Sequence, residues 1–344
     1  MNRQVTSEPP SREFLDVFRR IKRPFIVAHV TPDADAIGSA LGLATALRDQ
    51  GIEAVCGIPE NCVANRLQFM LSLAPDTPRE PHWTPDGTWD AAITLDTAGQ
   101  KRINIQPPID LAGEMPVFNI DHHITNSDYG RYNWVDPHAT STCELVARLL
   151  AALDWPLSPN VASLLYAGIH GDTAGFSLPP TSADSLHIAA ELVRAGADVA
   201  HIGEKLCRSQ NKPDFDLLGR VYDHTRVAGD GLIAYSYLDH EDFLASGCRA
   251  EDIDDQVSIP LALKGIRIAM LFTEGEKGVV RINLRGEGGV RVVELAQRFG
   301  GGGHVHAAGV RVRNKPIQDV VREVVNAANE QLAIPQETTS EPRP

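Results

Sequence analysis

Two histidines and one aspartate stand directly after a short apolar run and are the residues best suited to chemistry. The run covers residues 116–120, and Asp121, His122 and His123 follow it. Burying unpaired polar groups costs free energy, whereas the carboxyl ends of parallel strands are where ligands and metals bind. A predicted strand that ends in one carboxylate and two imidazoles therefore indicates a binding or catalytic site.

Three further segments carry acidic or imidazole groups where a predicted strand or helix ends. They are His29, Asp33 and Asp35 after the apolar residues 25–28, Asp96 after residues 91–95, and Asp172 at the end of a helical stretch. The carboxyl ends of neighbouring parallel strands share one edge of the sheet. We therefore expect these groups to meet Asp121, His122 and His123, although they lie far apart in the sequence.

The donor types in this set point to divalent metal ions. A single aspartate after a strand is more often a turn residue or a helix N-cap, and this alternative applies to Asp33 and Asp35 taken alone. As a set, carboxylates suit Mg²⁺ or Mn²⁺ and imidazoles suit later metals, so the mixture favours Mn²⁺ over Mg²⁺. Two histidines and four aspartates, six ligands in all, are more than one tetrahedral zinc needs. They suit two ions about 3.5–4 Å apart. Such a pair predicts hydrolysis of a phosphoester by activated water.

Composition favours a cytoplasmic enzyme that acts on small substrates. The net charge is −13, from 45 acidic and 32 basic residues, and no run of four Lys or Arg occurs. Proteins that hold long nucleic acids need a basic track, so duplex binding is not expected. The five cysteines form no CxxC pair, which is typical of reduced thiols. The N-terminus has no apolar stretch, and residues 259–272 are too short to span a bilayer, so no membrane association is expected.

The order of these segments resembles the DHH phosphoesterase family. Four motifs carry the resemblance: His29-x3-Asp33-x-Asp35-x2-Gly38-Ser39, Leu95-Asp96-Thr97, Asn119-Ile120-Asp121-His122-His123 and Gly171-Asp172-Thr173. A fifth, the glycine-rich segment 299–309, resembles a loop of the domain that follows the DHH domain in one branch of the family. Five motifs in the family's order make the resemblance specific.

The resemblance implies an α/β fold of two lobes, with the active site in the cleft between them. We expect a parallel-sheet DHH catalytic domain over residues 11–208 and a linker over 209–225. A smaller α/β domain that binds substrate is expected over 226–330. Residues 1–10 and 335–344 are polar and rich in proline, and we predict that they are disordered.

The resemblance also divides the chemical roles among the motif residues. One ion is expected on His29, Asp33 and Asp96, and the other on Asp35, Asp96, His122 and Asp172, with Asp96 bridging them. His123 is left to face the scissile phosphate as electrophile or proton donor. Asp121 is expected to orient a histidine ring from behind. The catalytic set is thus His123, Asp96 and Asp121.

The second domain is expected to hold the nucleotide. Arg285 lies in a strand that resembles one presenting an arginine to the substrate, although Gly286 stands where the family usually has serine. The planar fork of an arginine can hold a phosphate with two hydrogen bonds. The loop residues Gly301, Gly302, Gly303 and His304 would let a phosphate approach the backbone N–H groups, helped by a helix dipole if a helix follows. A flexible turn and an exposed strand arginine are the alternatives.

The size and layout of the chain resemble the small stand-alone branch of nanoRNases that also act as phosphatases of 3′-phosphoadenosine 5′-phosphate (pAp). We expect hydrolysis of short single-stranded RNA or DNA oligonucleotides, or of mononucleotide bisphosphates. A cyclic di-AMP or pApA phosphodiesterase is the alternative within the family. An inorganic pyrophosphatase is less favoured because that group lacks the glycine-rich motif, and a non-catalytic regulator would have a damaged ligand set. A homodimer would fit the family.

Overall fold

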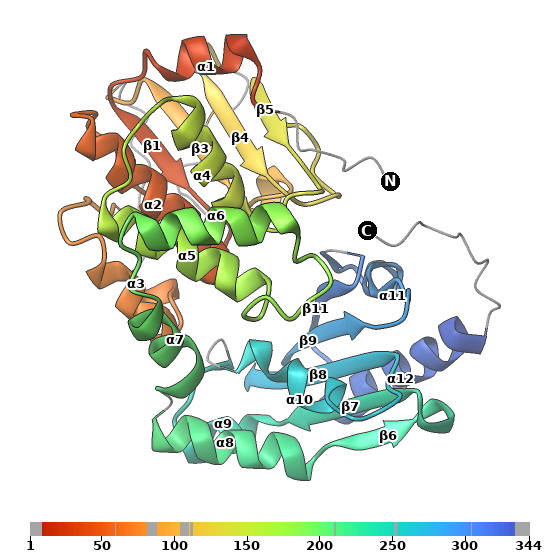
Figure 1. The fold of residues 1–344 in the computed structure, drawn as a ribbon. Helices are drawn as coiled ribbons and strands as arrows, with labels where there is room; N and C mark the ends of the chain where they lie inside the picture. The colour runs from red at the N-terminus through yellow and green to blue at the C-terminus, as the bar shows by residue number, and fades with distance from the viewer. Residues whose placement is uncertain are drawn as a thin grey trace. The chain divides into compact units, whose positions relative to one another are not determined.

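The computed structural model describes residues 9–58, 60–80, 88–103, 110, 113–209, 211–250, 253–303 and 305–333. The chain divides between residues 209 and 210 into two compact units (Figure 1), the N-terminal unit and the C-terminal unit. Most of segment 1–10 and all of segment 335–344, which we predict to be disordered, lie outside the described residues. No helix within the described ranges is long and apolar enough to cross a membrane.

The N-terminal unit is built on a parallel five-stranded sheet in the order β2-β1-β3-β4-β5. The strands are Pro24–Val27 (β1), Val55–Cys56 (β2), Ala91–Leu95 (β3), Val117–Asp121 (β4) and Tyr132–Val135 (β5). Every residue of β1, β3 and β4 is buried, as parallel strands in α/β proteins usually are. The predicted parallel sheet is confirmed.

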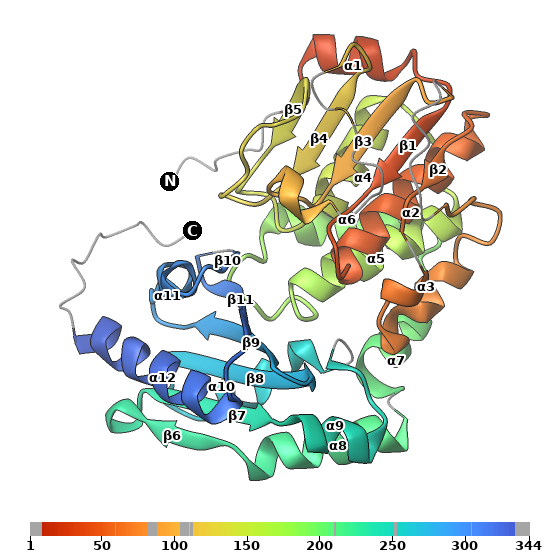
Figure 2. The same cartoon turned by 180° about the vertical axis from the view of Figure 1, so that it is seen from behind.

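Helices cover one face of this sheet (Figure 2). The helices of this unit are Arg12–Phe18 (α1), Ala34–Asp49 (α2), Gln68–Ser72 (α3), Thr142–Ala152 (α4), Pro159–Asp172 (α5), Ala183–Arg194 (α6) and Val199–Arg208 (α7), and α6 and α7 pack on α5. Helices α2, α4 and α5 pack against one another. The approach of α2 to α5 is so close that a Cβ on Gly38 would lie 2.5 Å from the carbonyl oxygen of Leu164. This packing fixes the positions of the first turn of α2 and the last turn of α5 relative to the sheet.

The strand order changes direction at β1. From β1 the chain passes to β2 on one side and then returns to β3, β4 and β5 on the other. In open parallel sheets, ligands bind beyond the carboxyl ends of the strands at such a switch point. The segments that follow β1, β3 and β4, each of which carries predicted site residues, therefore leave the sheet beside one another.

The C-terminal unit has a mixed six-stranded sheet in the order β10-β11-β9-β8-β7-β6, in which only β7 and β8 pair in parallel. The strands are Arg226–Ala228 (β6), Ile233–Leu238 (β7), Ile268–Glu276 (β8), Val279–Gly286 (β9), Gly302–Gly303 (β10) and Ala307–Arg313 (β11). The described helices are Lys212–Asp223 (α8), His240–Ser246 (α9), Ser258–Leu261 (α10), Val292–Arg298 (α11) and Ile317–Ala333 (α12). Helices α11 and α12 pack on one face of the sheet, and α8, α9 and α10 pack on β7 or β8 from the other. This α/β fold agrees with the predicted fold class.

Two parts of the C-terminal unit differ from what the sequence suggested. The segment proposed as a linker contains helix α8, whose Leu217 and Val221 are buried among residues of the C-terminal unit. The glycine-rich loop follows helix α11 and continues into strands β10 and β11. Among the described residues the loop leads into strands and not directly into a helix, so the suggested contribution of a helix dipole is wrong. Any anion at this loop has to be met by backbone N–H groups and side chains.

Candidate metal centre and active site

The loop after β1 supplies His29, Asp33 and Asp35. Asp33 is the N-cap of α2, and its Oδ1 accepts hydrogen bonds from the backbone N–H groups of Asp35 and Ala36 at 3.1 and 3.0 Å. Its other oxygen, Oδ2, lies 3.7 Å from Nε2 of His29. Asp33 is therefore a helix cap, as the simpler interpretation of the sequence held, and it also presents an oxygen to the cluster.

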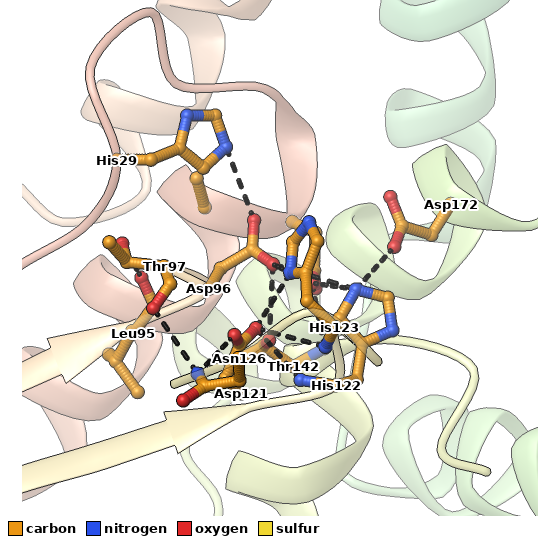
Figure 3. Close-up of polar contacts among 12 residues, drawn as sticks. His29, Leu95, Asp96, Thr97, Asp121, His122, His123, Asn126, Thr142 and Asp172 are labelled. Carbon is orange, nitrogen blue, oxygen red and sulfur yellow. Dashed lines mark hydrogen bonds and ion pairs between the residues drawn. The ribbon is translucent and has the colours of Figure 1, made fainter. Parts of the chain in front are cut away.

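Asp96 lies at the centre of the cluster. It follows β3 with a φ of 51°, a left-handed conformation that is uncommon outside glycine and enriched for aspartate. Its backbone N–H donates to the carbonyl of Ile120 at 3.1 Å, which ties it to β4. The two carboxylate oxygens point to different histidines: Oδ2 lies 3.3 Å from Nε2 of His29, and Oδ1 lies 3.5 Å from Nε2 of His122 (Figure 3).

His122 joins Asp96 to two more carboxylates. Its Nε2 lies 3.3 Å from Oδ2 of Asp172, the last residue of α5, and 3.8 Å from Oδ2 of Asp35 in the first turn of α2. Asp35 is 1% exposed and His122 is 6% exposed. The structure thus gathers donors from the ends of β1, β3, β4 and α5 in one buried place.

Hydrogen bonds to backbone carbonyls set which nitrogen of each ring faces the cluster. Nδ1 of His29 lies 2.9 Å from the carbonyl oxygen of Val30, and Nδ1 of His122 lies 3.3 Å from that of Ala139. A carbonyl oxygen can only accept, so each Nδ1 carries a proton. Nε2 is then the nitrogen able to bind a metal, and in both residues it is the atom directed at the carboxylates.

His123 is held in a different way. Its Nδ1 lies 2.7 Å from Oδ1 of Asp121, which also accepts the backbone N–H of His122 at 2.8 Å. The other oxygen of Asp121 accepts from the side-chain amide of Asn126 at 2.6 Å (Figure 3). Asp121 is completely buried. Its carboxylate thus orients the ring of His123, while Nδ1 of His123 also lies 3.4 Å from Oδ1 of Asp96.

The pKa values in the cluster reflect four carboxylates brought close together, of which Asp35 and Asp96 are buried. Burial, reinforced by the charge of Asp96, raises the pKa of Asp35 to about 6. Burial and the charge of Asp35 raise the pKa of Asp172 well above its usual value. Burial alone would lower the pKa of His29, but hydrogen bonds and charges from Asp33 and Asp96 outweigh it and raise the pKa to about 10. The carboxylates repel one another, and a cation bound among them would reduce this repulsion.

These donors fit divalent metal ions. Three groups of described residues each bring three ligand atoms within 4.8 Å of one another: His29 with Asp33 and Asp96, Asp35 with His122 and Asp172, and Asp96 with His122 and His123. Carboxylate oxygens mixed with imidazole nitrogens suit ions such as Mn²⁺ or Mg²⁺. The first group has the same residues as one predicted ligand set. The second has three of the four residues of the other set and lacks Asp96, whose Oδ1 lies 3.5 Å from Nε2 of His122.

Two contacts of the site were not anticipated from the sequence. The first residues of α4 donate their backbone N–H groups to Asp35, Thr142 at 2.7 Å and Cys143 at 2.8 Å. The hydroxyl of Thr142 also lies 3.3 Å from Oδ1 of Asp96. The helix start was recognisable from the N-cap Ser141, but its partner is 107 residues away in the chain. Asn126 likewise carried no sequence signal for its bond to Asp121.

The predicted substrate residues lie in the C-terminal unit. Arg285 is on β9 and donates from Nη1 to the carbonyl of Leu284 at 3.0 Å. A Cβ on Gly301 would lie 2.2 Å from the carbonyl oxygen of Gly309, so only glycine fits there. Gly302 and Gly303 form β10, whereas His304 lies outside the described residues.

Gly286 also has a local explanation. A Cβ at this position would meet the carbonyl oxygen of Val290 at 2.3 Å. The serine expected from the resemblance would therefore not fit without a change in the turn that follows β9. The departure from the family pattern is set by backbone packing, and it leaves Arg285 in place.

Comparison with known proteins gives the family. The model of the DHH family, N-terminal domain, matches residues 23–169, and the DHHA1 domain matches residues 231–333. A bifunctional oligoribonuclease and PAP phosphatase NrnA from Thermus thermophilus is 31% identical over 92% of this chain and 93% of that protein. The chain belongs to the DHH family.

Two further relatives extend over most of this DHH-family chain. The protein of the same name from Bacillus subtilis is 30% identical over 83% of this chain and 87% of that protein. The crystal structure of an exopolyphosphatase-related protein from Bacteroides fragilis superposes with a TM-score of 0.83 at 26% identity, covering 95% and 99% of the two chains. Enzymes of the family depend on metal ions and hydrolyse phosphoester bonds, which agrees with the donor set gathered around Asp96.

Proposed function

We propose that this chain hydrolyses short oligoribonucleotides and pAp by using two Mn²⁺ ions at the strand ends of the N-terminal unit. The observation that carries the proposal is the carboxylate of Asp96, whose two oxygens lie 3.3 Å from Nε2 of His29 and 3.5 Å from Nε2 of His122. A carboxylate between two ligand groups suits two ions about 3.5–4 Å apart. Mn²⁺ is favoured over Mg²⁺ because imidazole is mixed with carboxylate.

The same geometry supports the proposed assignment of ligands to the two ions. His29, Asp33 and Asp96 would hold one ion, and Asp35, Asp96, His122 and Asp172 would hold the other. When bound, the ions supply Lewis acidity and lower the pKa of water. The N–H groups of Thr142 and Cys143 fix the carboxylate of Asp35, which would keep its geometry constant during turnover.

His123 would act on the phosphate directly. Asp121 accepts the Nδ1 proton of its ring, which leaves Nε2 as the nitrogen that can exchange a proton with the substrate. The protonated ring would donate to a phosphoryl oxygen or to the leaving oxygen, and the buried carboxylate of Asp121 would stabilise its positive charge. Asn126 holds the far oxygen of Asp121 and so maintains the direction of the ring.

Arg285, Gly301, Gly302, Gly303 and His304 would bind the substrate. The Thermus and Bacillus relatives are named as bifunctional oligoribonucleases and PAP phosphatases, which supports oligonucleotides and pAp as substrates. Single strands are favoured over duplexes because a net charge of −13 opposes a long phosphate backbone. We further propose a homodimer and a cytoplasmic location, the latter because all five cysteines are free thiols.

The test is hydrolysis with Mn²⁺ by wild type, Asp96→Asn and a matched surface control, Asp154→Asn. Asparagine tolerates the left-handed conformation found at both Asp96 and Asp154, so backbone strain is the same in the two variants. Wild type and Asp154→Asn are expected to release phosphate from pAp and nucleotides from RNA at equal rates. Asp96→Asn should lose more than about 100-fold, since removing only an outer partner of a metal ligand costs about 10–100-fold. Equal rates in all three would refute the mechanism.

The same assay separates the alternatives. Relative kcat/KM values for pAp, short RNA, pApA, cyclic di-AMP and inorganic pyrophosphate should be highest for pAp or short RNA. A higher value for cyclic di-AMP or pApA would choose the alternative phosphodiesterase, and a higher value for pyrophosphate would choose a pyrophosphatase. The metal ligands would have the same roles in each case, so the substrate panel tests specificity alone.

A further inference from the structure

The C-terminal unit has a cavity of about 280 Å³ that none of the roles assigned so far uses. Its lining includes three arginines, Arg249 from the segment after α9, Arg281 on β9 and Arg311 on β11, with Gly275 and Glu276 at the end of β8. The chain as a whole carries a net charge of −13. Three guanidinium groups around one small cavity therefore run against the overall charge balance and mark a place suited to an anion.

The sheet register places two of these arginines directly opposite each other. Arg281 and Arg311 are partners in the antiparallel pair of β9 and β11. Like charges at opposed positions destabilise a sheet, so this pairing is unfavourable unless negative charge lies between or beside the two groups. Each of the three arginines also has an interaction within the protein.

A polar track on the same face connects the cavity to the proposed nucleotide site. Because side chains alternate along a strand, Arg281, Asn283 and Arg285 share one face of β9. The residues opposite Asn283 and Arg285 on β11 are Gly309 and Ala307. A Cβ on Gly309 would meet nothing closer than 3.9 Å, so the surface beside Asn283 is low and open.

The two ends of the track are spaced for a chain of nucleotides. Arg285 lies four residues after Arg281, and four steps along a strand span about 13 Å. A mononucleotide bound at Arg285 is too short to reach both arginines with its own phosphates and its base, whereas a single strand of several nucleotides carries a phosphate at each step. The cavity itself is of a size for a phosphate group and part of a sugar rather than for a dinucleotide.

We propose that the cavity formed by Arg249, Arg281 and Arg311 binds a backbone phosphate of a single-stranded oligonucleotide whose end nucleotide is held at Arg285. The inference rests on the proposed function, because it takes the substrate to be a short oligonucleotide. The planar forks of the arginines would hold the phosphate oxygens with charge-assisted hydrogen bonds. The cavity would then favour oligonucleotides long enough to reach it and would leave hydrolysis of pAp unaffected.

The kinetic test compares substrates of different length in the full-length protein with Mn²⁺. Arg281→Gln and Arg311→Gln are assayed on a five-nucleotide RNA, a dinucleotide and pAp, with Arg322→Gln as the matched control. Arg322 lies exposed on α12, which covers the other face of the sheet. The KM for the five-nucleotide RNA should rise about tenfold in the two cavity variants, the factor that one hydrogen bond to a charged group contributes. Values for pAp and for the control should not change.

Two outcomes of this assay would overturn the proposal. One is an equal loss on pAp and on the five-nucleotide RNA, which would mean that the arginines act on the fold. The other is no change on any substrate. Arg281→Lys separates charge from shape, since lysine keeps the charge without the fork and should recover only part of the affinity. If Arg281→Gln fails to fold, Arg311→Gln, at an exposed position, carries the test.

A binding measurement distinguishes failure of the cavity from failure of the proposed function. Fluorescence anisotropy of a labelled five-nucleotide RNA is recorded without divalent metal, so that no hydrolysis is required. Weaker binding by both cavity variants supports the cavity even if wild type hydrolyses neither RNA nor pAp. Unchanged binding in an enzyme that hydrolyses both removes the cavity and keeps the function. If the variants lose affinity for inorganic phosphate or AMP but not for the RNA, the cavity is a site for free phosphate and the proposal is wrong.

Discussion

The two units differ in how far their functional side chains are exposed to water. In the N-terminal unit, Asp96 and Asp121 are 2% and 0% exposed, and each is fixed by several hydrogen bonds. In the C-terminal unit, Arg281 and Arg285 are half-buried on one face of β9, Arg281 opposite Arg311 and Arg285 opposite Ala307. The first arrangement holds charges close together out of water, and the second lays positive charges along a surface.

This difference separates the expected effects of mutation. Buried charges interact strongly because the local dielectric constant is low and water does not screen them. The loss of one partner then leaves others uncompensated, and we expect large effects on kcat and metal content. Half-buried arginines are screened by water, so each should contribute a modest and independent share of substrate affinity.

Asp96→Asn should produce the largest change, because Asp96 would belong to both proposed ligand groups. We expect it to reduce kcat by more than about 100-fold, beyond the 10–100-fold typical of an outer partner of a ligand. It should also lower the number of Mn²⁺ ions bound per chain below that of Asp33→Asn. Asp33 contacts only the His29 group, and asparagine preserves its helix cap. Metal analysis after gel filtration measures both, and equal metal content in the two variants would argue against a bridging Asp96.

Asp121→Asn should have the next largest effect, because it removes a charge and leaves the side chains of all proposed metal ligands unchanged. The amide no longer offers a negative charge to Nδ1 of His123, so kcat should fall about 10–100-fold while metal content stays at the wild-type level. A double-mutant cycle with His123→Gln provides the check. If Asp121 acts through the ring, Asp121→Asn should cost nothing further in that background. Full additivity would mean that Asp121 has a separate role.

The contrast between the units also explains what could be read from the sequence. The mostly apolar run Ala91–Leu95 is enough to predict the buried strand β3. Parallel pairing then places Asp96 beside the end of β4 without further information. The contact of Thr142 with Asp35 could not be predicted, because it depends on how α4 docks at a separation of 107 residues.

The open face of the C-terminal unit gave weaker signals. Strand β11 begins with three small residues and then alternates valine with arginine, and such a segment lacks the apolar run that marks a buried strand. Helix α8 looked like a linker because only Leu217 and Val221 of its twelve residues are buried. The cavity arginines come from three separate segments, and only the antiparallel register shows that Arg281 and Arg311 are neighbours.

Arg285→Ala should have a moderate effect that is confined to nucleotide substrates. Loss of its charge-assisted contact is expected to raise the KM for pAp and short RNA about tenfold. Hydrolysis of a simple aryl phosphate ester, which has no nucleotide to grip, should be unchanged. Arg322→Ala on α12 removes the same side chain at an exposed position and serves as control. A parallel loss on the aryl ester would place Arg285 in the chemical step and weaken the division of labour between the units.

Gly168→Ala and Gly203→Ala give the smallest expected effects and test whether packing holds the metal ligands in place. Both glycines are in helices of the N-terminal unit, α5 and α7. A Cβ on Gly168 would lie 2.2 Å from Sγ of Cys143 and 3.0 Å from Oδ1 of Asp35, whereas Gly203 has nothing within 4 Å. The first change should therefore destabilise by about 1–3 kcal/mol through overpacking. The second should stabilise by about 0.5–1 kcal/mol, because alanine is the better helix former. Thermal unfolding gives the signs, and kcat should fall several-fold only in Gly168→Ala, since its crowding displaces Asp35. Wild-type kcat together with lowered stability in Gly168→Ala would show that Asp35 keeps its place without help from the helix packing.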